Sequence, residues 1–181
     1  KSALTKAKYP DNITVMVCQQ NKSGEDKFEC ISACKLSGDC KGNIVVQELE
    51  HTEAKGPCYA RFLIQNKWDG EEYFCQVDSH TIFTENWDEK CINMLEKLPE
   101  KSVLTQYPTG FNHKTLKTNN GVRNGLIAVN IERGDGFWRC NSSFHSGSKK
   151  KPFEANAWGA CFSFSKGDLL REARDDYQTP S

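Results

Sequence analysis

Residues 68–80 read WDGEEYFCQVDSH, and this stretch decides both the predicted fold and the place of the predicted site. The run from Tyr73 to Val77 is short, apolar and aromatic, and it lies between Gly70 and a polar break, which predicts a buried strand. Asp78 and His80 follow it. Side chains two residues apart on an extended backbone point to the same side, where a carboxylate and an imidazole could share one divalent cation. The alternative is that Asp78 is a turn or capping residue and His80 a loop histidine.

The segments around this strand alternate between strand and helix patterns. Pro57 suits a first helical position, and Asn86 with Glu89 could form a capping box. Cys91, Met94 and Leu95 are expected on the inner face of the second helix. We expect strands over residues 12–19, 43–49 and 102–107 and helices over residues 55–68 and 86–98. The alternation predicts an α/β fold with a Rossmann-type, mainly parallel central sheet flanked by helices. Ligands gather at the carboxyl ends of strands in such sheets, which is where Asp78 and His80 would stand.

The second half of the chain is less regular. We expect a strand over residues 125–132 and a last strand over 158–165, followed by a polar, helix-like tail. Polar connections are expected over 112–124 and 134–152. The second connection carries Lys149 to Lys151, interpreted as a solvated loop, with contact to an anionic group as the alternative.

Composition limits the classes of partner. The 181 residues carry 24 Lys plus Arg and 24 Asp plus Glu, so charge gives no case for nucleic acid or an anionic membrane as the main partner. No apolar run approaches the roughly 20 residues of a membrane helix, so we expect no membrane segment in this chain. The sequence begins neither with Met nor with a signal-peptide pattern, and we expect a natural N-terminal segment to be missing.

The nine cysteines are an odd number, so they cannot all pair within the chain. Three lie in apolar runs, where a thiol usually behaves as a small buried hydrophobe: Cys18, Cys75 and Cys161. Three others cluster within eleven residues: Cys30, Cys34 and Cys40. The cluster lacks a Cys-x2-Cys pair and a nearby histidine, which favours a disulfide or free thiols over a zinc site.

Several segments are similar to a known family. They are GPCYAR (56–61), the stretch 68–80, NWD (86–88) and LTQYP (104–108), with weaker matches over 11–15, 18–21 and 162–165. The most specific part is residues 70–80 with Trp87 and Asp88. These residues resemble the eukaryotic and microbial GlcNAc-transferase family. Its founding type, a UDP-GlcNAc:hydroxyproline-polypeptide GlcNAc-transferase, modifies a hydroxyproline of a cytosolic ubiquitin-ligase adaptor.

The resemblance implies a GT-A fold and a retaining enzyme that moves GlcNAc from UDP-GlcNAc to a polypeptide hydroxyl, with a hydroxyproline-like acceptor. It assigns Asp78 and His80 as ligands of Mn²⁺ (or Mg²⁺), held together with the donor diphosphate. Ser79 and Arg61 become donor-binding residues, although Arg61 could equally be a helix-surface or ion-pair residue. Trp87 and Asp88 are expected to brace the loop of the metal motif. No catalytic nucleophile is identified, and the partners implied are the UDP-GlcNAc donor and a protein acceptor.

The resemblance also implies a domain organisation. We expect residues 1–181 to form a single GT-A domain, incomplete at both ends, with a nucleotide-sugar-binding half over 1–107 and the start of an acceptor-side half over 108–181. The family's first strand is not present before Lys1, the tail does not continue as expected, and Cys161 stands where such enzymes tend to have glycine. The alternative is a diverged, non-catalytic module on the same fold.

Location is predicted from the cysteines. Buried thiols favour a reducing compartment, so we expect the chain to be cytoplasmic. The alternative is a cysteine-rich domain in the secretory pathway lumen, where Asn12, Asn21 and Asn141 would be glycosylation acceptors.

Overall fold

The computed structural model describes residues 1–22, 41–112, 114–117, 124–131, 138–144, 152, 154–155 and 158–173. The predicted cysteine cluster and the lysine run lie outside these residues. The elements are α1 (Ser2–Thr5), the 3-10 turns η1 (Pro10–Asn12) and η2 (His51–Glu53), β1 (Thr14–Asn21), β2 (Asn43–Glu50), α3 (Pro57–Gln65), β3 (Tyr73–Val77), α4 (Trp87–Leu95), β4 (Leu104–Thr105), β5 (Asn124–Ile131), β6 (Trp138–Phe144), β7 (Phe162–Lys166) and α5 (Leu169–Glu172).

The chain divides into two compact units, each discontinuous in sequence. The first comprises Lys1–Glu72, Ile82–Lys90 and Gly167–Ser181, and the second comprises Tyr73–Thr81 and Cys91–Lys166. In the described residues no helix is long and apolar enough to cross a membrane.

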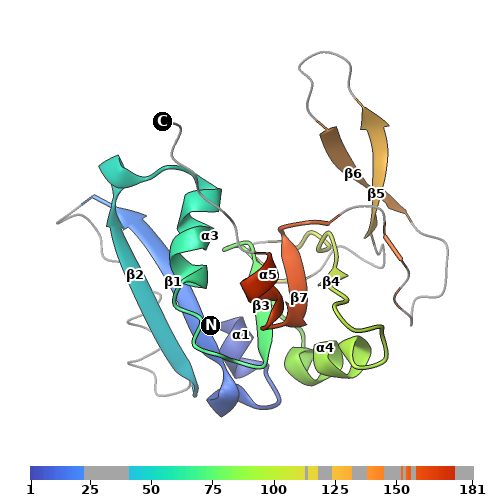
Figure 1. Cartoon of the computed structure of the whole chain (residues 1–181), viewed down its shortest axis with the longest axis horizontal. Helices are drawn as coiled ribbons and strands as arrows, with labels where there is room; N and C mark the ends of the chain where they lie inside the picture. Colours follow the sequence, from blue (N-terminus) through green and yellow to red (C-terminus); the bar gives the residue numbers. More distant parts are fainter. Residues whose placement is uncertain are drawn as a thin grey trace. The chain divides into compact units, whose positions relative to one another are not determined.

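The first unit is built on a parallel pair of strands. β1 runs alongside β2 in a register from Thr14 opposite Asn43 to Asn21 opposite Glu50, and α3 lies against β1 (Figure 1). Gly56 has φ 87°, so the chain turns on a glycine before the helix. The helix begins at Pro57, as the sequence predicted. The predictions of two strands and of a helix in this region are confirmed, with bounds shifted by a few residues.

Gly42 shows why the start of β2 needs a glycine. Its φ is 91°, and an added Cβ would lie 2.4 Å from the carbonyl oxygen of Pro10 and 2.9 Å from the side chain of Leu4. Leu4 is among the most buried of the described residues, with 3% of its surface exposed. The N-terminal segment therefore packs directly on the entry to β2.

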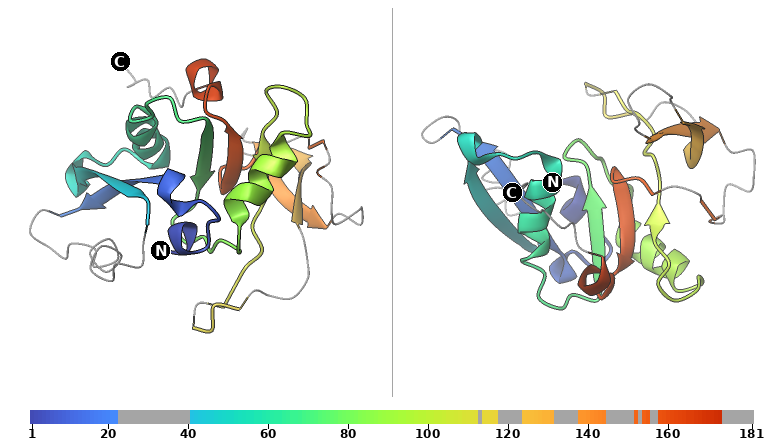
Figure 2. Two further views of the ribbon diagram at one scale, coloured as in Figure 1. Left: turned by 90° about the horizontal axis from the view of Figure 1, so that it is seen from below. Right: turned by 45° about the horizontal axis from the view of Figure 1, so that its top comes forward.

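The second unit contains a three-stranded antiparallel sheet in the order β3-β7-β4. β3 and β7 lie side by side, with Tyr73 opposite Lys166 and Val77 opposite Phe162 (Figure 2). The rings of Tyr73 and Phe164 stack with centroids 5.5 Å apart. Phe164 and Leu104 of this sheet are buried, and so are Cys91 and Leu95 of α4.

This sheet corrects the predicted fold. β3 forms over Tyr73–Val77 as expected, but its partner is antiparallel, so the expectation of one mainly parallel sheet is wrong for the described strands. The cause is β7, which returns from the far end of the sequence and pairs with β3 on one side and β4 on the other. A parallel pair is present only as β1 and β2. The described architecture is α/β.

Five local predictions also need correction. The expected polar connection 134–152 contains β6, which pairs antiparallel with β5. β6 is mostly polar, so it gave no apolar signal. β4 is only two residues long, and β7 begins at Phe162 because residues 160 and 161 form a turn. Met94 is 37% exposed and does not belong to the inner face of α4. Asn86 precedes α4 with φ 54°, whereas a capping residue normally has an extended backbone.

Candidate functional site

The predicted metal motif lies directly at the end of β3. Asp78 is the first residue after the strand, and Ser79 and His80 form the turn that follows. Asp78 is half-buried, whereas Ser79 and His80 are exposed. The backbone N–H of Asp78 donates to the carbonyl oxygen of Cys161 at 3.3 Å, which extends the pairing of β3 with β7 by one residue. The carboxylate is thus placed by sheet pairing, while the imidazole is open to solvent.

A turn over residues 158–161 leads into β7 and is bound to the end of β4. The Thr105 hydroxyl accepts from the Gly159 N–H at 3.0 Å and lies 3.1 Å from the carbonyl oxygens of Gly159 and Phe162. Cys161 Sγ donates to the carbonyl oxygen of Gln106 at 3.3 Å. One threonine side chain therefore fixes both ends of the turn.

The same turn is bound to the end of β3. Gln76, which is buried, donates from Nε2 to the carbonyl oxygen of Ala160 at 3.5 Å, and Asp78 donates its backbone N–H to Cys161. The 158–161 turn consequently joins the end of β3 that carries Asp78 to the end of β4.

Trp158 stands at the start of this turn. Half of its surface (50%) is exposed, and its indole Nε1 donates at 3.1 Å to the hydroxyl of Ser163, which is only 8% exposed. The sequence had placed Trp158 inside a strand. The signal that could have found the turn is Gly159, because an isolated glycine in an apolar run often marks a break.

Arg61 belongs to the first unit and the other three predicted site residues to the second. It is half-buried on α3, and its role in donor binding stays a prediction. Asp78, Ser79 and His80 are brought together simply because they are consecutive in one turn.

The metal-ligating side chains at this turn suit a metal ion that binds together with the substrate. Within the described ranges, no group of three or more His, Cys, Asp or Glu side chains could hold a metal ion. Asp78 and His80 offer two ligands, and hard divalent cations such as Mg²⁺ are often bound by one or two carboxylates plus substrate phosphates and water. The residues present therefore fit a cation shared with a diphosphate, and the metal assignment stays a prediction.

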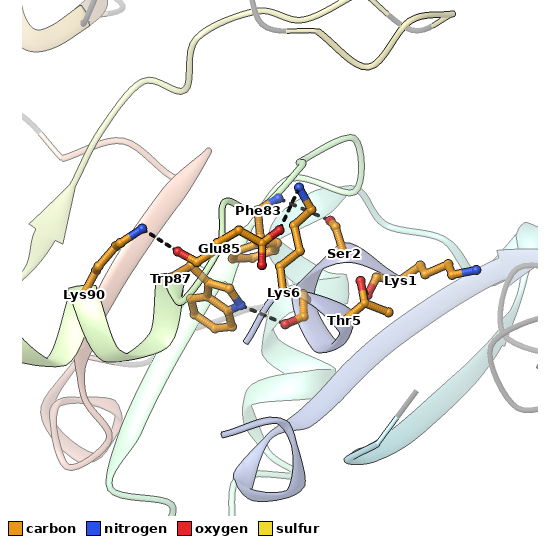
Figure 3. A network of polar contacts seen from close by, with 9 residues as sticks. Lys1, Ser2, Thr5, Lys6, Phe83, Glu85, Trp87 and Lys90 are labelled. Atoms are coloured by element: carbon orange, nitrogen blue, oxygen red, sulfur yellow. Dashed lines mark hydrogen bonds and ion pairs between the residues drawn. The ribbon is translucent and has the colours of Figure 1, made fainter. Parts of the chain in front are cut away.

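Trp87 and Asp88, which also matched the family pattern, are buried and bind the N-terminal segment. The indole of Trp87 donates to the carbonyl oxygen of Ala3 at 2.8 Å (Figure 3). The two carboxylate oxygens of Asp88 accept from the backbone N–H groups of Lys8 and Tyr9 at 2.8 and 2.9 Å. These contacts define a structural role for both residues within the first unit.

The loop before α4 is bound to the same segment. Asn86 donates its backbone N–H to the carbonyl oxygen of Lys6 at 2.7 Å, and Phe83 donates to the Ser2 hydroxyl at 3.2 Å. Lys6 also pairs with Glu85 at 3.5 Å (Figure 3). Residues 82–90 are therefore held by residues 1–9, and the expectation that Trp87 and Asp88 brace the loop of the metal motif stays a prediction.

The cysteines of the second unit do not offer an activated nucleophile among the described residues. Burial, and secondly the neighbouring Cys91, raise the pKa of the Cys75 thiol far above its usual range. Cys161 uses its thiol as a donor to Gln106. The described cysteines whose state is defined are all free: Cys18, Cys58, Cys75, Cys91 and Cys161.

A family model described as "Glycosyltransferase (GlcNAc)" matches residues 16–180. This match covers most of the chain and includes most of β1 and all of β2 to β7, with all four predicted site residues. No curated protein and no solved structure matches the chain.

Proposed function

We propose that this chain, which belongs to the glycosyltransferase (GlcNAc) family, is a metal-dependent enzyme that moves GlcNAc from UDP-GlcNAc to a polypeptide hydroxyl of the hydroxyproline type. A GlcNAc transferase implies a nucleotide-sugar donor and an acceptor. The observation that carries the proposal is the family match together with a carboxylate and an exposed imidazole at the end of β3. The finer assignments, which are a GT-A fold, UDP as the nucleotide and retention of configuration, belong to the proposal.

Asp78 and His80 would hold Mn²⁺, with Mg²⁺ as the alternative. When bound, this ion would supply positive charge that stabilises the departing diphosphate. Asp78 suits the role because its backbone is fixed by Cys161 while its side chain is only half-buried. Ser79 is exposed in the same turn and is proposed to contact the nucleotide, and Arg61 is proposed to bind the donor.

Catalysis in this proposal depends on positioning. The thiols of Cys75 and Cys161 are unsuited to attack, the first because its pKa is raised by burial and the second because it is hydrogen bonded. Holding donor and acceptor hydroxyl in reactive geometry, with the leaving diphosphate stabilised, can supply a large part of the rate enhancement. We propose retaining transfer without a protein-bound sugar intermediate.

A second candidate is a binding module that holds a nucleotide and does not transfer sugar. It is favoured by the small number of metal-ligating side chains, since the two of Asp78 and His80 are enough for metal-dependent nucleotide binding. Both candidates are proposed for the cytoplasm, because Cys58 is exposed and Cys18 half-buried and both are free, which suits a reducing compartment.

The decisive experiment is calorimetric titration of UDP into the chain with Mn²⁺ and with EDTA. We expect binding only with metal, and a loss of at least about tenfold in affinity, roughly 1.4 kcal/mol, in Asp78→Ala and His80→Ala. Asp69→Ala is the matched control, because Asp69 is an exposed acid in the first unit, and it should leave UDP affinity unchanged.

The proposal is contradicted if neither EDTA nor Asp78→Ala changes UDP binding. A second assay separates the two candidates by measuring the release of UDP from UDP-GlcNAc in the presence of a hydroxyproline peptide. Sugar transfer to the peptide supports the enzyme, whereas metal-dependent binding without transfer supports the binding module.

A further inference from the structure

Trp158 combines exposure with a fixed orientation. A tryptophan that is 50% exposed leaves a large apolar ring in water, which stabilises nothing in the folded chain by itself. Yet its Nε1 is bound at 3.1 Å to the hydroxyl of Ser163, a buried residue of β7. A hydrogen bond to a buried partner holds the indole edge against the sheet and leaves the rest of the ring accessible.

The backbone beside Trp158 is also fixed. The Gly159 N–H donates to the Thr105 hydroxyl at 3.0 Å, and the carbonyl oxygen of Gly159 lies 3.1 Å from the same hydroxyl. The turn ends at Cys161, whose carbonyl accepts from the N–H of Asp78 at 3.3 Å. Trp158 therefore stands on a turn that is tied at two points to the sheet.

The distance along the chain places the ring near the metal motif. Trp158 and Cys161 are three residues apart, so their Cα atoms are separated by at most about 11 Å. Cys161 is in direct backbone contact with Asp78. All of these residues belong to the second unit, so the relation does not depend on how the two units are arranged. A ligand whose phosphates lie at Asp78 would have its next group within reach of the indole.

We propose that Trp158 is a specificity-determining residue on which the pyranose ring of the donor sugar packs, so that the site distinguishes a nucleotide sugar from the bare nucleotide. The inference rests on the proposed function and deepens it. The C–H face of a hexosamine is apolar while its hydroxyl and amide groups are polar, and an aromatic ring with one polar edge matches that chemistry. The side chain of Trp158 loses little conformational entropy on binding because the hydrogen bond to Ser163 already orients its ring.

The experiment compares UDP with UDP-GlcNAc, each titrated with Mn²⁺ into the full chain and its variants. Trp158→Ala should weaken UDP-GlcNAc binding by about tenfold, and UDP binding should stay within about twofold. Trp158→Phe should keep part of the preference, because a ring remains while the bond to Ser163 is lost. Tyr9→Ala is the matched control, since Tyr9 is an aromatic of similar exposure (48%) in the first unit, and it should change neither affinity.

A second readout is independent of affinity. Saturating UDP-GlcNAc should change tryptophan fluorescence more than saturating UDP does, and Trp158→Phe should abolish the difference. Thermal unfolding of each variant identifies any loss of folding, which Trp158→Phe is designed to avoid.

The possible results separate the two proposals. Selective loss of UDP-GlcNAc affinity supports the role of Trp158. Equal loss for both ligands, or no loss, overturns that role while the proposed function stands. If the unchanged chain binds neither ligand, the proposed function falls and the role of Trp158 falls with it.

Discussion

Replacing Asp88 by alanine removes both acceptors that hold the backbone of Lys8 and Tyr9. Asp88 is 6% exposed, and its two oxygens accept from two consecutive N–H groups at 2.8 and 2.9 Å. Hydrogen bonds to charged groups contribute roughly 1.5–3 kcal/mol each to stability. Lys8 and Tyr9 are themselves exposed, so water can hydrate the released N–H groups and the lower end of that range applies. The expected loss is about 3 kcal/mol for Asp88→Ala.

Asp88→Asn should lose less. The amide keeps one acceptor oxygen of similar size and position, but it loses the charge and replaces the other acceptor by a donor. We expect a loss of about 1.5–2 kcal/mol. The free energy of unfolding should therefore increase from alanine to asparagine to aspartate at position 88. The number and charge of the acceptors set this order, since the three side chains differ little in apolar area.

Urea denaturation gives the free energy of unfolding, and hydrogen exchange at Lys8 and Tyr9 gives the local effect. The matched control is Asp168→Ala, an exposed carboxylate of the same unit whose ion pair with Arg171 at 3.5 Å should contribute almost nothing. A loss below about 1 kcal/mol for Asp88→Ala, or unchanged exchange at both amides, would refute the assignment of Asp88 as the main anchor of the N-terminal segment.

Two further predictions concern packing and thiol chemistry. Gly167→Ala should destabilise by about 1–3 kcal/mol, because a Cβ there would lie 2.1 Å from the carbonyl oxygen of Glu71. Gly56→Ala, which meets only backbone strain at φ 87°, should lower the free energy of unfolding by about 1 kcal/mol. A chemical denaturation experiment in which Gly56→Ala is more destabilising than Gly167→Ala would contradict this prediction. In iodoacetamide labelling read by mass spectrometry, exposed Cys58 should react in the native chain, whereas half-buried Cys75 should react much more slowly until the chain unfolds, since desolvation raises the pKa of its thiol. Equal native rates for the two thiols would contradict the raised pKa of Cys75.

The elements that sequence predicted well are those with a strong local signal. β3 has the expected bounds because an aromatic run ends at a polar break, and α3 begins at Pro57 because the ring fixes a helical backbone angle. β2 was identified from its β-branched residues. In each case the deciding information lies within about ten consecutive residues.

The elements that sequence predicted poorly depend on distant partners. β6 has a mainly polar composition, and its pairing with β5 compensates for the absence of an apolar run. The antiparallel partner of β3 is β7, about ninety residues away, and strand alternation between neighbours could not indicate it. Asp88 was matched as part of a motif, but its partners Lys8 and Tyr9 lie about eighty residues earlier.

In the candidate site, too, the locally encoded part could be predicted from the sequence and the part that depends on distant partners could not. The position of Asp78 and His80 after β3 could be predicted from thirteen consecutive residues, but the turn beside them could not. That turn exists because β7 inserts between β3 and β4, which brings Cys161 to Asp78 and Gly159 to Thr105. If the donor sugar binds there, two segments about eighty residues apart in sequence share the recognition of one ligand: the motif after β3 binds the diphosphate and the turn before β7 binds the sugar. Variants in the two segments should then separate nucleotide affinity from sugar preference, which a single local motif could not do.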